Sequence, residues 1–117
     1  MKVYVENIFL SLDTITPCGM IISELLSNSM KYAFPGGTKG RITIQCHLTD
    51  DGEVQLRISD NGVGLPQGFN FKNTKSLGFK LICKLVEDQL KGSIELQREK
   101  GTNFLIKFRE IKPHSML

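Results

Sequence analysis

Hydrophobic and polar residues alternate in several segments of the chain, which is the pattern of strands with one buried face. The alternation is imperfect at the start of the chain, where it indicates a strand with an irregularity near Glu6 and Asn7. The later segments form two pairs that each flank a short turn, so each pair predicts a β-hairpin. The predicted strands lie within residues 2–12, 42–48, 54–58, 94–96 and 104–108.

Two other segments carry apolar residues at the helical spacing of three and four. The first starts with Thr16 as N-cap and Pro17 at the first helical position, and it runs to about Ala33, before a Pro-Gly-Gly sequence. The second covers residues 76–90, and Gly92 is placed to end it. The pattern therefore predicts two amphipathic helices.

The order of these elements predicts the fold class. Residues 61–75 are rich in Gly, Asn and Lys and lack periodicity, which indicates a functional loop or lid. Most strands are joined by tight turns, which favours antiparallel pairing. We expect an α+β two-layer sandwich with a mixed, mainly antiparallel sheet and helices packed on one face. Residues 1–111 would form one domain and residues 112–117 a flexible tail.

The composition narrows the class of protein. Hydrophobic residues make up 40% of the 117 residues and charged residues 23%, which is typical of one soluble globular domain. The net charge of +3 comes without a long run of one sign, so nucleic-acid binding is not expected. Three cysteines in apolar segments indicate reduced thiols, and no run of apolar residues is long enough to span a membrane. We expect a cytoplasmic domain that does not itself contact a membrane, whether or not its parent protein is anchored in one.

Three polar residues share one face of the first predicted helix. Glu24, Asn28 and Lys31 follow one another at helical spacing, while Ile22 and Leu25 lie on the face expected to pack on the sheet. The polar face is either simply solvated or binds a ligand. In the second case the amide oxygen of Asn28 would bind magnesium, and Glu24 would orient or deprotonate a nucleophile.

An aspartate continues the inward register of the strand at residues 54–58. Asp60 follows that strand with the same alternation, so its carboxylate should point to the core side of the sheet, where it needs a polar partner. Gly62 and Gly64 complete an Asp-x-Gly-x-Gly motif that lets the backbone approach a flat ligand. The carboxylate could accept a hydrogen bond from the exocyclic amine of adenine. Alternatively, it only caps an Asp-Asn-Gly turn.

Two further elements begin with small or polar residues. Ser76, Leu77 and Gly78 open the second helix, whose unpaired N–H groups would favour a phosphate; a plain serine cap is the alternative. Gly101 and Thr102 lie in the last hairpin turn, where glycine requires no further reason. The threonine becomes chemically relevant only if the aspartate pocket binds a ligand.

Taken together, the order and spacing of these motifs resemble the N, G1, G2 and G3 boxes of the Bergerat-fold ATPases. That superfamily includes histidine kinases, the heat-shock chaperone ATPase, type II topoisomerase ATPase subunits and the mismatch-repair MutL proteins. Residues 17–35 resemble the long N box of histidine kinases and are the most specific part of a resemblance that extends from about Leu10 to Phe108. The resemblance implies the Bergerat fold and Mg-ATP as ligand.

The resemblance also implies a role for each motif residue. Asn28 would be the magnesium ligand and Glu24 the acidic N-box residue, while Lys31 and Tyr32 would contact the phosphates and line the nucleotide. The residues matching the nucleotide-binding G boxes are Asp60 for adenine, Gly62 and Gly64 (G1), Gly78 with Ser76 and Leu77 (G2), and Gly101 with Thr102 (G3). The chain departs from the family in the G2 box, with Ser76 at a usual glycine and Phe79 at a usual leucine.

The implied function is that of a sensor histidine kinase catalytic domain, which donates the γ-phosphate of ATP to a histidine on a separate dimerisation domain. A response regulator would receive the phosphoryl group downstream. His47 lies in a predicted strand and His114 in the tail, so neither resembles a phosphoacceptor, and the isolated chain should not autophosphorylate. The alternatives are an ATP-driven conformational switch, an anti-sigma-type serine kinase and a nucleotide sensor without catalysis.

Overall fold

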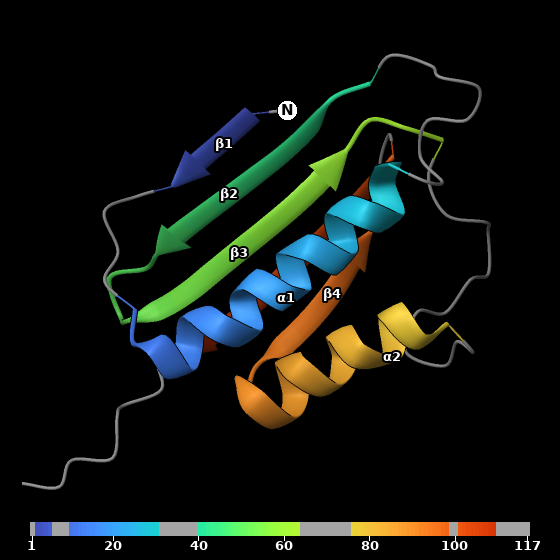
Figure 1. Ribbon diagram of the computed structural model, residues 1–117. Coiled ribbons are helices and arrows are strands. Elements are labelled where there is room, and N and C mark those ends of the chain that lie inside the picture. Colours follow the sequence, from blue (N-terminus) through green and yellow to red (C-terminus); the bar gives the residue numbers. More distant parts are fainter. Residues whose placement is uncertain (1, 6–9, 31–39, 64–75, 99–100, 110–117) are drawn as a thin grey trace, which may run out of the picture.

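The computed structural model describes most of the chain, as one sheet with helices on one side. Five strands and the helices lie within the described residues, and the helices α1 (Leu12–Asn28) and α2 (Leu77–Lys84) cross the same face of the sheet side by side (Figure 1). This arrangement confirms the predicted two-layer α+β sandwich. The described residues are 2–5, 10–30, 40–63, 76–98 and 101–109.

The sheet is mixed, and most of its strand pairs are antiparallel. Its strand order is β1-β2-β3-β5-β4, with β1 parallel to β2 and every other neighbouring pair antiparallel. Both predicted hairpins are confirmed, and β3 lies at the centre of the sheet between β2 and β5. The strands are β1 (Lys2–Val5), β2 (Ile42–Leu48), β3 (Glu53–Asp60), β4 (Ser93–Gln97) and β5 (Thr102–Arg109).

The first helix, α1 (Leu12–Asn28), begins before the predicted first helical position, Pro17. Its N-cap is Ser11, whose carbonyl oxygen accepts hydrogen bonds from the N–H groups of Thr14 and Ile15. Pro17 therefore lies inside the helix and not at its first position. The prediction of a strand reaching residue 12 was wrong for the same reason, because Leu12 already belongs to α1. The predicted helix end at Ala33 lies outside the described residues.

The second helix, α2 (Leu77–Lys84), continues as the π-helical segment η4 (Leu85–Gln89), in agreement with the predicted range 76–90. Ser76 is its N-cap and accepts a hydrogen bond from the Phe79 N–H. The residue with positive φ after η4 is Lys91, at 54°, and not the predicted terminator Gly92. Gly92 still helps to end the helix, because its N–H donates to the Val86 carbonyl oxygen at 2.9 Å, and it also allows close packing, since a Cβ there would lie 2.1 Å from the Lys107 carbonyl oxygen.

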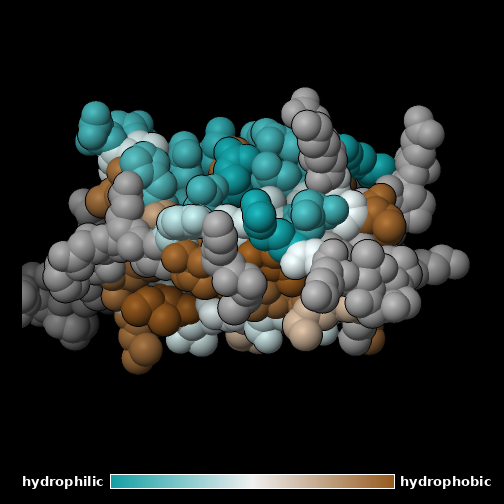
Figure 2. Space-filling model, turned by 90° about the horizontal axis from the view of Figure 1, so that it is seen from above, coloured by the Kyte–Doolittle hydropathy of each residue, from teal (hydrophilic) through white to brown (hydrophobic). Residues whose placement is uncertain are grey.

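The core lies between the helices and the inner face of the sheet. Val54, Leu56 and Ile58 of β3 are each at most 3% exposed, as the alternation predicted. Each such buried side chain contributes about 1.5–3 kcal/mol through the hydrophobic effect. The outer face is hydrophilic, as the upper side of Figure 2 shows. Other core residues are Ile21 and Leu25 of α1, Ile82 and Val86 of the second helix, and Phe104 and Ile106 of β5.

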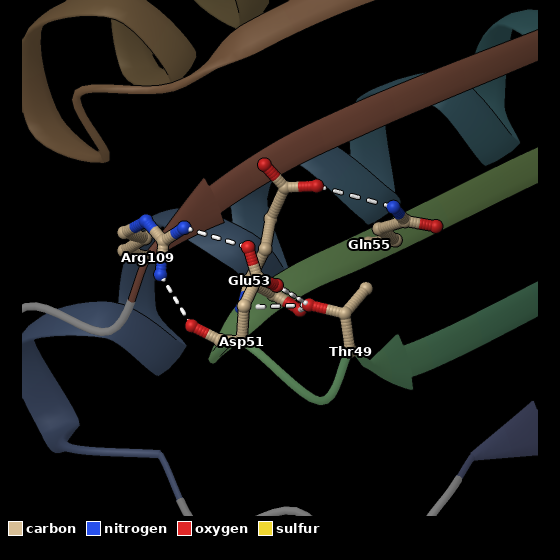
Figure 3. A network of polar contacts seen from close by, with 5 residues as sticks. All are labelled: Thr49, Asp51, Glu53, Gln55 and Arg109. Carbon is tan, nitrogen blue, oxygen red and sulfur yellow. Dashed lines mark hydrogen bonds and ion pairs between the residues drawn. The ribbon is translucent and has the colours of Figure 1, made fainter.

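A polar network closes the β2–β3 turn at one end of the sheet (Figure 3). Thr49 donates a hydrogen bond to the Asp51 carboxylate, and the Arg109 guanidinium lies 3.0 Å from the same carboxylate. Arg109 also donates to the Asp51 carbonyl oxygen at 2.6 Å, so the network ties the end of β5 to the turn. The Thr49 hydrogen bond and then Arg109 hold the pKa of the Asp51 carboxyl below its usual value of 3.8.

Two further observations concern the environment of the chain. All three cysteines are free thiols; Cys18 is buried, while Cys46 and Cys83 are half-buried. Among the helices in the described ranges, none combines the length and apolar character that crossing a membrane requires.

Candidate functional site

The predicted site residues gather at the end of the sheet opposite the Thr49 network. Asp60 ends β3 and is paired with Thr102, which begins β5. The last turn of α1 and the first turn of α2 lie beside these strand ends (Figure 1). Four elements far apart in the sequence therefore contribute to one site.

Asp60 is held in place by hydrogen bonds from three directions. Its side chain is buried at 8% exposure, as expected from its register in β3. Its Oδ1 accepts from the Gly62 N–H at 3.0 Å and from the Thr102 N–H at 3.3 Å. Its Oδ2 accepts from the Ser29 hydroxyl at 3.0 Å. The carboxylate thus caps the turn and also faces the core side of the sheet, so the two interpretations of the motif are compatible.

Gly101 brings the β5 backbone close to Asp60. Its φ is +115°, and a Cβ at this position would lie 2.1 Å from the Asp60 carbonyl oxygen. Only glycine tolerates both the conformation and the contact. The adjacent Thr102 is buried at 8% exposure. The glycine of the last turn therefore has a structural reason beyond the turn itself, because it lets β5 approach the aspartate.

Glu24 and Asn28 of α1 face the start of α2 across Gly78. A Cβ built on Gly78 would lie 2.8 Å from Glu24 Oε2 and 3.9 Å from Asn28 Nδ2. Both side chains are half-buried, so neither Glu24 nor Asn28 is fully solvated. The structure thus brings the polar face of α1 next to the N-terminus of α2, where unpaired N–H groups favour an anion.

The amide of Asn28 has unused hydrogen-bonding capacity. Its Nδ2 is buried and finds no hydrogen-bond partner within the described parts of the chain. Turning the amide by 180° exchanges its oxygen and nitrogen, so the same position can present an oxygen to a cation. Mg²⁺ in nucleotide sites needs only one or two protein oxygens, with phosphates and water as its other ligands. Asn28 and the neighbouring Glu24 carboxylate fit that requirement.

The remaining predicted site residues divide into two groups. Gly62 contacts Asp60, and Ser76 caps α2, whereas the Leu77 side chain is 82% exposed, so that its contact with a nucleotide stays a prediction. Lys31, Tyr32 and Gly64 lie outside the described residues.

Sequence reasoning missed Ser29, whose hydroxyl binds the Asp60 carboxylate. The signal was present in the helical period. Ser29 follows the buried Leu25 by four positions, so it lies on the core-facing side of α1, where a hydroxyl requires a polar partner. The unpaired carboxylate predicted at Asp60 was the obvious candidate for that partner.

By its fold and its site, the chain is a two-layer α+β domain with a polar site at the ends of its strands. The model of the histidine kinase-, DNA gyrase B- and HSP90-like ATPase family matches residues 14–112. The chain belongs to this ATPase family.

Individual relatives are consistent with that family. The sensor histidine kinase PdtaS of Mycobacterium tuberculosis (strain ATCC 25618 / H37Rv) is 34% identical over 98 residues, which cover 81% of this chain and 19% of PdtaS. The serine-protein kinase RsbW of Listeria innocua is 38% identical over 52 residues, which cover 44% of this chain and 32% of RsbW. The chain therefore spans about a fifth of the length of PdtaS.

A solved structure shows the same fold. The histidine kinase domain of the Erythrobacter litoralis EL346 blue-light activated histidine kinase superposes with a TM-score of 0.85 at 22% identity. The match covers 93% of this chain and 50% of that chain. At this identity the likeness supports the fold alone.

Proposed function

We propose that this chain is the ATP-binding catalytic domain of a histidine kinase, which transfers the γ-phosphate of ATP to a histidine on a separate helical domain. The observation that carries the proposal is the buried Asp60 carboxylate, held beside the Glu24 and Asn28 face of α1 and the start of α2. Family membership and the similarity to PdtaS support it.

In this proposal, Asp60 recognises the adenine base. Its carboxylate is an acceptor fixed by backbone donors at the end of β3, so it can accept a hydrogen bond from the exocyclic amine without reorganising. The close approach of β5 at Gly101 and the adjacent Thr102 would form the wall of the adenine pocket. Gly64 and Tyr32 would complete that pocket by analogy with the family motifs.

The other half of the site, at α1 and the start of α2, would bind the phosphates. Asn28 would hold Mg²⁺, which neutralises phosphate charge when bound. The N–H groups at the start of α2, in residues 76–78, would bind phosphate oxygens, with Lys31 adding positive charge. Glu24 would orient the attacking histidine of the partner domain or accept its proton. Phosphoryl transfer depends mainly on such positioning and charge stabilisation.

The proposal requires a partner for each step. The phosphoacceptor would lie on a helical dimerisation domain of the parent protein, and a response regulator would receive the phosphoryl group afterwards, in the cytoplasm. His47 cannot replace that phosphoacceptor. It lies on β2, where its register with Gln55 places it on the outer face of the sheet, away from the helices and the site.

A serine kinase is the second candidate. The similarity to RsbW, a serine-protein kinase, favours it over a stretch of 52 residues. Glu24 could serve a serine hydroxyl as well as an imidazole, because a carboxylate can act as base toward both. The two candidates differ only in the acceptor, which the bound phosphate reveals.

Labelled Mg-ATP distinguishes these functions. The chain is incubated in three ways: alone, with the phosphoacceptor helical domain of a PdtaS-type kinase, and with a protein that is the substrate of an anti-sigma-type serine kinase. Acid-labile, base-stable label on the helical domain alone would support the proposal, whereas acid-stable label on serine would favour the second candidate. Hydrolysis without transfer, or label on the isolated chain, would contradict both. The Asp60→Asn variant is the control, since loss of its acceptor oxygen should abolish the signal while the fold persists.

A further inference from the structure

We propose that Ser29 is a positioning residue that makes this site selective for adenine, by holding Asp60 in the orientation that accepts the exocyclic amine. The inference rests on the proposed ATP site and names a determinant of its specificity. Its basis is the hydrogen bond from the Ser29 hydroxyl to Asp60 Oδ2, at 3.0 Å, between the end of α1 and the end of β3.

Asp60 has one acceptor position left after its contacts with the described residues. A carboxylate offers about four lone-pair positions, two on each oxygen. Oδ1 receives the N–H groups of Gly62 and Thr102, and Oδ2 receives the hydroxyl of Ser29. The remaining position is therefore on Oδ2, the oxygen that Ser29 holds. Because the carboxylate is planar and turns about its Cβ–Cγ bond as one unit, the Ser29 hydrogen bond on Oδ2 restrains that rotation together with the two donors on Oδ1.

This arrangement discriminates among purines by hydrogen-bond polarity. Adenine presents N–H donors at its 6-position, whereas guanine and hypoxanthine present a carbonyl oxygen there. With Ser29 donating, Ser29 Oγ and Asp60 Oδ2 have only acceptor positions left for a ligand. Both groups then reject a 6-carbonyl and accept a 6-amine. A site built to bind a donor disfavours an analogue without it, because its buried acceptor stays unpaired.

Removing the hydroxyl should weaken the selection without dismantling the pocket. In Ser29→Ala, the Gly62 and Thr102 donors still hold Oδ1, so Asp60 stays in the pocket, but its planar carboxylate loses one of the three hydrogen bonds that resist rotation about Cβ–Cγ. We expect the Kd for ATP to rise about tenfold, since a hydrogen bond to a charged group contributes about 1.5–3 kcal/mol. Ser29→Thr keeps the hydroxyl and should restore the affinity. Ser29→Cys, of similar size but with a weak donor, should behave like alanine.

The decisive measurement compares purine nucleoside triphosphates with different groups at the 6-position. Calorimetry gives the Kd of ATP, of the triphosphate of purine riboside, which has hydrogen at that position, and of ITP, which has a carbonyl there and a hydrogen on N1. Ser29→Ala should leave the purine riboside triphosphate nearly unchanged and reduce the preference for ATP over ITP about tenfold. Ser23→Ala, an exposed serine on the same helix, is the matched control and should change none of the three.

Equal losses for all three nucleotides would overturn the inference, because they would show that Ser29 only supports the fold. Unchanged ATP affinity in both Ser29→Ala and Ser29→Cys would overturn it as well, while the proposed function would stand. A wild-type chain that binds no ATP would refute the proposed function and this inference together. The first two results differ in whether ATP affinity changes in the Ser29 variants, and only the last one concerns the unsubstituted chain.

Discussion

Replacing Gly101 by alanine tests whether the close approach of β5 to Asp60 builds the site. The added Cβ would lie 2.1 Å from the Asp60 carbonyl oxygen, whereas real Cβ atoms essentially never come closer than 3.0 Å to such an atom. The two backbones must therefore move apart by the difference, 0.9 Å. The hydrogen bond from the Thr102 N–H to Asp60 is already 3.3 Å long, so we expect this movement to break it.

Two terms determine the loss of stability in Gly101→Ala. A non-glycine residue at φ +115° costs about 1–3 kcal/mol in backbone strain. Relieving the overlap adds about 1–3 kcal/mol, as in other overpacked sites. The sum, about 2–6 kcal/mol, compares with a total stability of about 5–15 kcal/mol for a domain of this kind. Most Gly101→Ala molecules should remain folded at low temperature, but with a clearly reduced free energy of unfolding.

Gly52→Ala is the matched control for this substitution. Gly52 also has a positive φ, +92°, but its added Cβ would meet only the Arg109 Nη1 atom, at an ordinary 3.5 Å. It lies at the opposite end of the sheet, so it should lose about 1–3 kcal/mol of stability and keep its affinity for ATP. In Gly101→Ala we expect affinity to fall at least about tenfold, through displacement of Asp60. Urea denaturation and calorimetry measure both quantities. Wild-type ATP affinity in a folded Gly101→Ala would refute the reasoning.

Three other substitutions test separate parts of the molecule. Asn28→Ala should weaken magnesium-dependent ATP binding but spare adenosine, and equal losses for both ligands in calorimetry would contradict the metal assignment. Gly78→Ala should slow phosphoryl transfer up to about 100-fold by displacing the carboxylate beside it, whereas Gly19→Ala, with nothing within 4 Å of its Cβ, should keep wild-type transfer rates. The pKa of Asp51 is depressed by the hydrogen bond from Thr49, so its stabilisation is complete above the unfolded pKa of about 3.8 and is lost as pH falls through the lower folded pKa. Denaturation midpoints should therefore fall less between pH 4 and about pH 2.5 in Asp51→Asn than in the wild type, and parallel curves would contradict this.

Alternation along the strands was the most informative pattern for the fold. The register of Val54, Leu56 and Ile58 correctly placed Asp60 on the buried side, because a side-chain period of two leaves no freedom once one face is in the core. The same reasoning identified both hairpins. Their turns and their buried faces specify them locally, so no tertiary information was needed.

The start of α1 could not be predicted in the same way. Thr16 and Pro17 have the form of an N-terminal signal, yet Ser11 caps the helix and Thr16 donates its hydroxyl to the Leu12 carbonyl within it. Tertiary packing decides the outcome, because Thr14, at 0% exposure, and Pro17 are both buried in the folded domain. Local signals cannot register such contacts. The parallel pairing of β1 with β2 is equally non-local and was left undetermined by the sequence beyond a mixed sheet.

The two ends of β3 differ in how completely their polar groups are satisfied. At the Glu53 end, hydrogen bonds and an ion pair link Thr49, Asp51 and Arg109, and the turn has no evident strain beyond the positive φ of Gly52. The Asp60 end has a buried carboxylate and an Asn28 amide nitrogen with no partner among the described residues. It also has Gly101, whose close approach to Asp60 is possible only because glycine has no Cβ. Buried polar groups without a hydrogen-bond partner persist in native proteins where a ligand can supply that partner. The asymmetry along one strand thus separates the end whose polar groups hold the turn together from the end at which we propose that the nucleotide binds.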